Sequence, residues 1–159
     1  MNITILCVGR MKEKPYRQMA DEYRKRLTRF GKIEEIEVPD LAEPDKAGGE
    51  LETRVKEREG EQLLARIRPT DYVIALTIPG KRRDSEGFSR HLADLAVHGR
   101  SSVVFVIGGS LGLSQAVLSR ADEEMSMSDM TFPHQLARVM LYEQVYRAMK
   151  IQAGERYHK

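Results

Sequence analysis

The sequence has little of what secreted and membrane proteins are built from. It holds a single cysteine and no tryptophan, and nothing approaches the roughly 18 consecutive apolar residues that a membrane span requires. One cysteine forms no disulfide within the chain, so Cys7, in an apolar run, is predicted to be a buried structural thiol in a reducing compartment. No basic segment precedes an apolar stretch at the N-terminus, so we expect no secretory signal and a cytoplasmic location.

A strong excess of one charge is also missing. The 26 lysines and arginines exceed the 24 aspartates and glutamates by only two, so net charge alone does not indicate nucleic acid binding. Basic residues are nevertheless concentrated at 1–30, at 81–83 and after residue 134. Separated basic patches can converge on a phosphate backbone, although charge alone favours a solvated surface.

Short apolar runs alternate with amphipathic segments along the whole chain. The expected strands are Asn2–Val8, Lys32–Val38, Asp71–Ile78, Ser102–Ile107 and Glu123–Ser128. The expected helices are Pro15–Phe30, Glu50–Arg68, Ser85–Val97, Ser114–Arg120 and Gln135–Gln152, with Ser85 as a cap. Residues 41–49, which contain Pro44 and two glycines, predict a surface loop. The alternation predicts one α/β domain over residues 1–159, with a mainly parallel sheet flanked by helices.

The last expected helix is apolar on nearly all of its faces. From Leu136 to Ile151, 11 of 16 residues are apolar or tyrosine. Such a helix must be buried on more than one side. Packing against the sheet on one side and a second subunit on the other predicts a homodimer; a central core helix in a monomer is the alternative.

A glycine-rich turn follows the strand that ends at Ile107. Residues 107–114 read IGGSLGLS, and glycines at such a turn let a ligand approach the backbone. In open α/β sheets ligands bind beyond the carboxyl ends of the strands. The spacing is not that of a dinucleotide-binding fingerprint, and no acidic residue stands at the expected ribose position. The segment Pro79-Gly80-Lys81 lacks the framework of a phosphate loop, which argues against an NTPase.

A methionine-rich segment separates the last strand from the last helix. It reads MSDMTFPH over residues 127–134 and combines backbone hydrogen-bonding groups with thioether and phenyl surface, which suits an adenine ring. Pro133 fits a helix start, and Thr131 is a candidate N-cap. His134, at a helix N-terminus, is expected to have its charged form disfavoured.

The chain closes with Tyr157-His158-Lys159. An aromatic side chain can stack on an unpaired base and a lysine can contact a phosphate, although chain ends are often frayed.

Together these segments resemble the RlmH (YbeA-like) family of small SPOUT-class methyltransferases. The resemblance covers the whole length, and it is strongest from Leu76 through IGGSLGLS (107–114), MSDMTFPHQLARVMLYEQVYRA (127–148) and the terminal YHK. Two departures are visible: Met127 stands where the family commonly has leucine, and Arg156 replaces the proline common before the Tyr-His pair. The second departure bears on the orientation of the tail.

The resemblance implies a SPOUT (α/β-knot) fold with a C-terminal trefoil knot, which periodicity does not reveal. It also implies an obligate homodimer that uses S-adenosyl-L-methionine to methylate N3 of a pseudouridine in helix 69 of 23S rRNA in the assembled ribosome. Carried over by position, cofactor binding falls on Leu76, Gly108, Met127, Ser128, Asp129, Met130, Thr131 and Phe132. Tyr157 and His158 match the family's terminal pair, implicated in catalysis or substrate binding.

The resemblance suggests a mechanism without a metal. His158 is the candidate general base for the N3 proton; alternatively, water removes the proton while Tyr157 and His158 hold the base. Arg138, Lys159, Lys81–Arg83 and the basic residues of the first helix are expected to contact RNA. Other readings are a SPOUT methyltransferase acting on tRNA and a non-catalytic S-adenosylmethionine- or RNA-binding factor of the ribosome.

Overall fold

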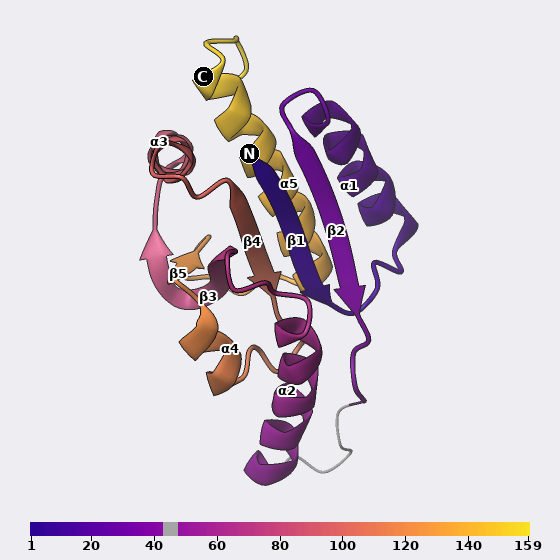
Figure 1. Ribbon diagram of the computed structural model, residues 1–159. Coiled ribbons are helices and arrows are strands. Elements are labelled where there is room, and N and C mark those ends of the chain that lie inside the picture. The colour runs from indigo at the N-terminus through magenta and orange to yellow at the C-terminus, as the bar shows by residue number, and fades with distance from the viewer. Residues whose placement is uncertain (43–47) are drawn as a thin grey trace.

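The computed structural model of the protein, shown in Figure 1, describes residues 1–42 and 48–159. Five strands form one parallel sheet in the order β2–β1–β4–β3–β5. The strands are β1 (Asn2–Val8), β2 (Lys32–Val38), β3 (Tyr72–Arg82), β4 (Ser102–Ile107) and β5 (Glu123–Ser126). The central strands β1 and β4 are almost continuous apolar runs because both of their faces are covered by helices.

Helices cover the two faces of the sheet unequally. One face carries α1 (Lys14–Leu27), α3 (Ser85–Val97) and α5 (His134–Gln152), whose apolar residues share a core with Ile3, Ile5 and Phe105 of the sheet. The other face carries α2 (Gly49–Leu64) and α4 (Gln115–Arg120), which pack on a smaller valine-rich core (Figure 1). No helix in the described part of the chain is long and apolar enough to cross a membrane.

The observed bounds match the expected ones for β1, β2, β4 and α3 and differ elsewhere at the ends. Helix α1 ends at Leu27 and α2 at Leu64, a few residues earlier than predicted. Asp84, rather than Ser85, caps α3, because its carboxylate accepts a hydrogen bond from the Gly87 amide at 2.6 Å. The central part of the predicted loop over 41–49, residues 43–47, lies outside the described residues.

Strand β3 is longer than the sequence predicted and is interrupted. Leu76 and Lys81 both register with Met125 of β5, so residues 77–80 bulge away from the ladder between them. Gly80 permits this arrangement: a Cβ there would lie 2.7 Å from the backbone C and N atoms of Met125. The bulge therefore rests directly on the backbone of β5.

Buried charges connect α5 to the edge of the sheet. Arg138 is fully buried, and its Nη1 atom donates to Glu37 Oε1 at 2.6 Å while Nη2 donates to the Gly9 carbonyl at 3.0 Å. Arg17 of α1 and the Tyr142 hydroxyl both donate hydrogen bonds to Glu35, and each bond is 2.6 Å long. Arg138 was expected to contact RNA phosphates; its burial removes it from that surface, and its role is structural.

Candidate functional site

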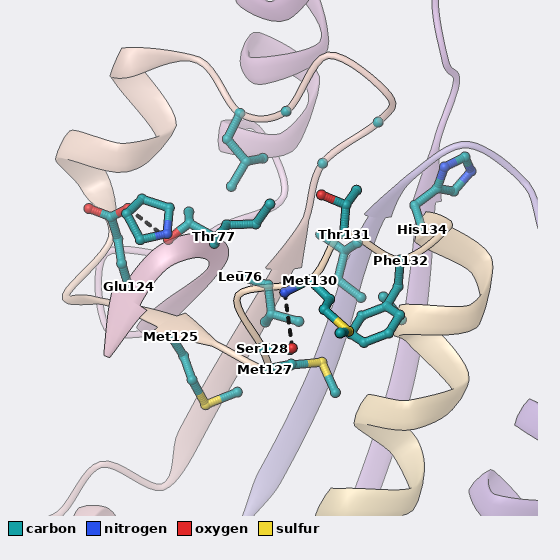
Figure 2. A pocket seen from close by; sticks show the side chains of 18 of the residues that line it. Leu76, Thr77, Glu124, Met125, Met127, Ser128, Met130, Thr131, Phe132 and His134 are labelled. Carbon is teal, nitrogen blue, oxygen red and sulfur yellow. Dashed lines mark hydrogen bonds between the residues drawn. The ribbon is translucent and has the colours of Figure 1, made fainter. Parts of the chain in front are cut away.

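A cavity of about 450 Å³ opens where β3, β4 and β5 end. Loops after these three strands line it, together with the first turn of α5 (Figure 2). Cavities of roughly 300–1,000 Å³ hold ligands of the size of a nucleoside derivative. Of the cofactor residues carried over from the resemblance, the lining includes Leu76, Gly108, Met127, Ser128, Met130, Thr131 and Phe132. Three segments far apart in the sequence thus meet in one place.

The glycine turn forms the wall that follows β4. Gly112 has φ +85°, a conformation that favours glycine, and its amide donates to the Gly109 carbonyl at 3.1 Å. A Cβ on Gly108 would lie 2.9 Å from the Gly112 carbonyl carbon and 3.0 Å from its oxygen. The turn is therefore closed so tightly that a side chain at residue 108 would force it apart.

Helix α2 supports the glycine turn from the other side. A Cβ on Gly60 would lie 2.3 Å from Ser114 Oγ, so only glycine allows α2 to approach this closely. Ser114 in turn caps α4 by accepting a hydrogen bond from the Val117 amide at 3.3 Å. The position of the turn thus depends on a helix that contributes nothing to the lining of this cavity.

The methionine-rich loop is held by its own serines. The Ser126 hydroxyl donates to the Ser128 carbonyl at 3.0 Å. The Met130 amide donates to Ser128 Oγ, also at 3.0 Å (Figure 2). Thr131 was expected to cap α5, but Pro133 occupies that position and Thr131 lines the cavity. The side chain of Asp129 pairs with Arg82 at 2.6 Å, and Asp129 is not part of the lining, unlike the other residues of the 127–132 loop.

Sequence reasoning missed the polar corner of the cavity. Glu124, on β5, accepts a hydrogen bond from the Thr77 hydroxyl at 2.9 Å, and Figure 2 shows both side chains at one end of the site. The pairing arises because β5 lies beside β3 and the Thr77 bulge leaves the ladder at this point. No residue spacing in the sequence indicates a contact that depends on the pairing of β3 with β5.

His134 stands at the start of α5, between this cavity and a smaller one lined by Asp40 and Glu59. Burial, helped by the nearby positive charge of Arg138, lowers the pKa of His134 below its ordinary value. The imidazole is therefore neutral at pH 7, as the sequence predicted, although burial rather than the helix terminus is the main cause.

The C-terminal tail does not reach this cavity within one chain. Tyr157 packs edge-on against Tyr146, with ring centroids 5.0 Å apart, and its hydroxyl donates to Glu143 at 3.1 Å. His158 lies near Arg147, with Nδ1 3.3 Å from Nη1. These contacts run from the middle of α5 toward its C-terminal end, and the helix is roughly 27 Å long. Figure 1 shows the C-terminus at the opposite end of the sheet from α4. The expected meeting of tail, glycine turn and methionine-rich loop is absent from the single subunit.

Several of the basic residues expected at an RNA surface are neutralised by partners. Arg17 pairs with Glu35, Arg29 with Glu155, and Arg83, which is mostly buried, with Glu123. Arg82 is exposed but paired with Asp129. Lys81 is exposed and forms no ion pair with a described residue, so it is the member of the 81–83 cluster that is available to a phosphate.

The lining fits an adenosine-based methyl donor. Leu76, Phe132 and the methionine side chains provide apolar walls for the faces of a purine, and the backbone of both loops provides partners for its edges. Within the glycine turn, a Cβ on Gly112 would meet no protein atom within 4 Å, so the space beside this residue is open. In residues 1–42 and 48–159 no group of three or more His, Cys, Asp or Glu side chains could hold a metal ion.

Comparison with known proteins agrees with this geometry. The family described as "Predicted SPOUT methyltransferase" matches residues 1–158. The chain is 52% identical to proteins named ribosomal RNA large subunit methyltransferase H from Shouchella clausii and from an Exiguobacterium species, over the full length of both chains in each case. It is equally similar, over the same extent, to ribosomal RNA large subunit methyltransferase H 1 of Clostridium perfringens. The chain therefore belongs to the SPOUT methyltransferase family.

Proposed function

We propose that the protein methylates RNA of the large ribosomal subunit with S-adenosylmethionine as the donor, at N3 of a pseudouridine in helix 69 of 23S rRNA in the assembled ribosome. The observation that carries the proposal is the meeting of Leu76, the glycine turn and the 127–132 loop in one cavity. Full-length relatives at 52% identity are named for methylation of large-subunit rRNA, which supports the substrate class.

The donor supplies an electrophilic methyl group, which passes to N3 as the S–CH3 bond breaks and the N3 proton leaves. The task of the protein is therefore alignment of the acceptor nitrogen with that bond, which can contribute several kcal/mol. The close packing of the turn at Gly108 and the hydrogen bonds of Ser126 and Ser128 hold the two loops in place, which suits this task.

The proposed enzyme is a homodimer in which each cavity is completed by the tail of the partner subunit. Within one chain, the cavity and the tail lie at opposite ends of α5. A two-fold axis that crosses α5 would exchange its ends and bring the tail of each copy toward the cavity of the other. Leu136 and Met140 on α5 are only partly buried, and Met130, 72% exposed, and Ile78, 47% exposed, stand on the lining. A second copy would cover this apolar surface.

In this arrangement Tyr157 and His158 act on the target base. His158 takes the N3 proton as general base, or it holds the base while water takes the proton. Lys159 and Lys81 are exposed and contact phosphates. The C-terminal trefoil knot belongs to the same proposal. A cytoplasmic location follows from a ribosomal substrate.

Transfer of tritium from labelled S-adenosylmethionine tests the proposal directly. Assembled ribosomes, separated subunits and tRNA are offered in parallel, and the labelled nucleotide is mapped. We expect label in large-subunit rRNA of assembled ribosomes, at a pseudouridine of helix 69. Label in tRNA would replace the substrate, and donor binding without label in any RNA would indicate a non-catalytic binding factor.

A further inference from the structure

We infer, on the basis of the proposed function, that Glu124 anchors the ribose of the methyl donor by accepting hydrogen bonds from its two vicinal hydroxyls. Glu124 is exposed and lines the cavity beside Thr77, directly before Met125. Its register partner in β3 is Ala75, next to Leu76. Glu124 is thus paired with the residue next to Leu76 in β3 and stands three residues before Met127, and both Leu76 and Met127 are positions assigned to the donor site.

Glu124 is chemically isolated in an otherwise uncharged wall. Among the described residues that line the cavity, it supplies the one carboxylate, and His134 is the one imidazole. Glu124 forms no ion pair with a described residue, and it accepts a hydrogen bond from the hydroxyl of Thr77. A carboxylate has about four acceptor positions, and Thr77 occupies one of them.

The hydrogen bond from Thr77 gives the carboxylate a fixed direction. Thr77, at the start of the 77–80 bulge, donates from its Oγ1 atom to Glu124 Oε1 over a distance of 2.9 Å. With one oxygen held by protein, the remaining lone pairs are directed to the cavity or to solvent. Thr77 therefore acts as a positioning residue for Glu124.

The donor offers two kinds of partner for such a group. The ribose carries two neighbouring hydroxyl donors, which match the two oxygens of one carboxylate, as acidic residues do in dinucleotide sites. The sulfonium carries positive charge but no hydrogen to donate, so it would not need the directional arrangement that Thr77 imposes. Hydrogen-bonding geometry thus favours the ribose.

Titration calorimetry with intact protein separates these roles. The probes are S-adenosylmethionine, S-adenosylhomocysteine and the 3′-deoxy analogue of S-adenosylhomocysteine, and the variants are Glu124→Gln, Thr77→Val and the surface control Glu50→Gln. We expect Glu124→Gln to weaken both natural ligands equally, by roughly ten- to a hundredfold, as for other hydrogen bonds to a charged group. The 3′-deoxy analogue should lose much less affinity, Thr77→Val should have a smaller effect, and Glu50→Gln should bind as wild type does.

Three results would overturn the inference. A loss of affinity confined to S-adenosylmethionine would place the carboxylate at the sulfonium, because S-adenosylhomocysteine has an uncharged thioether there. An unchanged affinity for both natural ligands would remove Glu124 from the donor site. An equal loss for the 3′-deoxy analogue would indicate a general disturbance of the cavity. If the wild-type protein bound neither natural ligand, the proposed function would fail together with the inference, whereas the other outcomes leave it standing.

Discussion

Arg138 and Glu37 form an ion pair 2.6 Å long in which the arginine side chain is fully buried. The pair joins the first half of α5 to the edge strand β2, and the same guanidinium holds the Gly9 carbonyl at the end of β1. A basic residue in a sequence of this family therefore serves the interior of the fold, next to the helix terminus that borders the cavity.

Replacement of Arg138 by alanine should destabilise the protein by about 3–5 kcal/mol, because it leaves Glu37 without its closest cation and the Gly9 carbonyl without a donor. Urea unfolding measures this loss. At a temperature where the variant remains folded, the salt dependence of its RNA binding should equal that of wild type. If the variant unfolded at the wild-type urea midpoint and its RNA binding depended less steeply on salt, Arg138 would be an RNA-contacting residue.

Acid should unfold the protein partly through Glu35. Burial acts to raise the pKa of Glu35, but hydrogen bonds from Arg17 and Tyr142 outweigh it and hold the pKa below the usual 4.5. A lowered folded-state pKa contributes stability that is present above pH 4.5 and is lost as the pH falls through the folded value. The free energy of unfolding, measured by urea titration from pH 7 to pH 3, should therefore decline below about pH 4.5.

Tyr142→Phe removes one of these hydrogen bonds, so the folded-state pKa of Glu35 should rise toward 4.5 and the loss of stability in acid should become smaller. Tyr16→Phe is a matched control on α1, because the Tyr16 hydroxyl forms no hydrogen bond with a described residue. Parallel pH profiles for both variants and wild type would contradict the role given to Tyr142.

Gly60→Ala should weaken donor binding although the residue lies outside the cavity. The added Cβ would meet Ser114 Oγ at 2.3 Å and displace the end of the glycine turn, at a cost of about 1–3 kcal/mol in stability. Gly48→Ala is the control, since nothing lies within 4 Å of a Cβ there. In a double-mutant cycle, Ser114→Ala should recover part of the affinity that Gly60→Ala loses. Strict additivity would mean that the two residues do not act through this contact.

Lys81 should contribute one phosphate contact. Lys81→Ala is expected to weaken RNA binding and to reduce the slope of log affinity against log salt by about one. Lys32→Ala, at the start of β2, removes another exposed lysine and should leave the slope unchanged. Equal effects of the two substitutions would mean that binding responds to net charge alone.

The sequence predicted what depends on local periodicity and chain order. The runs Asn2–Val8 and Ser102–Ile107 were placed correctly because both are continuous apolar strands, and alternation with helices predicted the parallel sheet, which the structure confirms. The glycine turn and methionine-rich loop were placed in one site by resemblance, and the cavity brings them together.

What the sequence did not predict depends on contacts between distant segments. The second pairing of β3 with β5 at Lys81 has no local signal, so the Thr77–Glu124 corner was missed. Arg138 looks like any other basic residue until Glu35 and Glu37 are seen on the neighbouring edge strand. The position of the tail depends on the direction of α5, which periodicity does not specify.

Mixed dimers test the central claim most directly, namely that a cavity in one subunit works with the tail of the other. One subunit carries Gly108→Ala, which forces the glycine turn apart, and the other lacks residues 157–159. Differently tagged chains are co-expressed, and the mixed dimer is isolated and given ribosomes and labelled S-adenosylmethionine. Each pure variant should be inactive, while the mixed dimer, with one intact site, should show about half the wild-type activity. An inactive mixed dimer, formed from variants that fold and associate normally, would contradict the account.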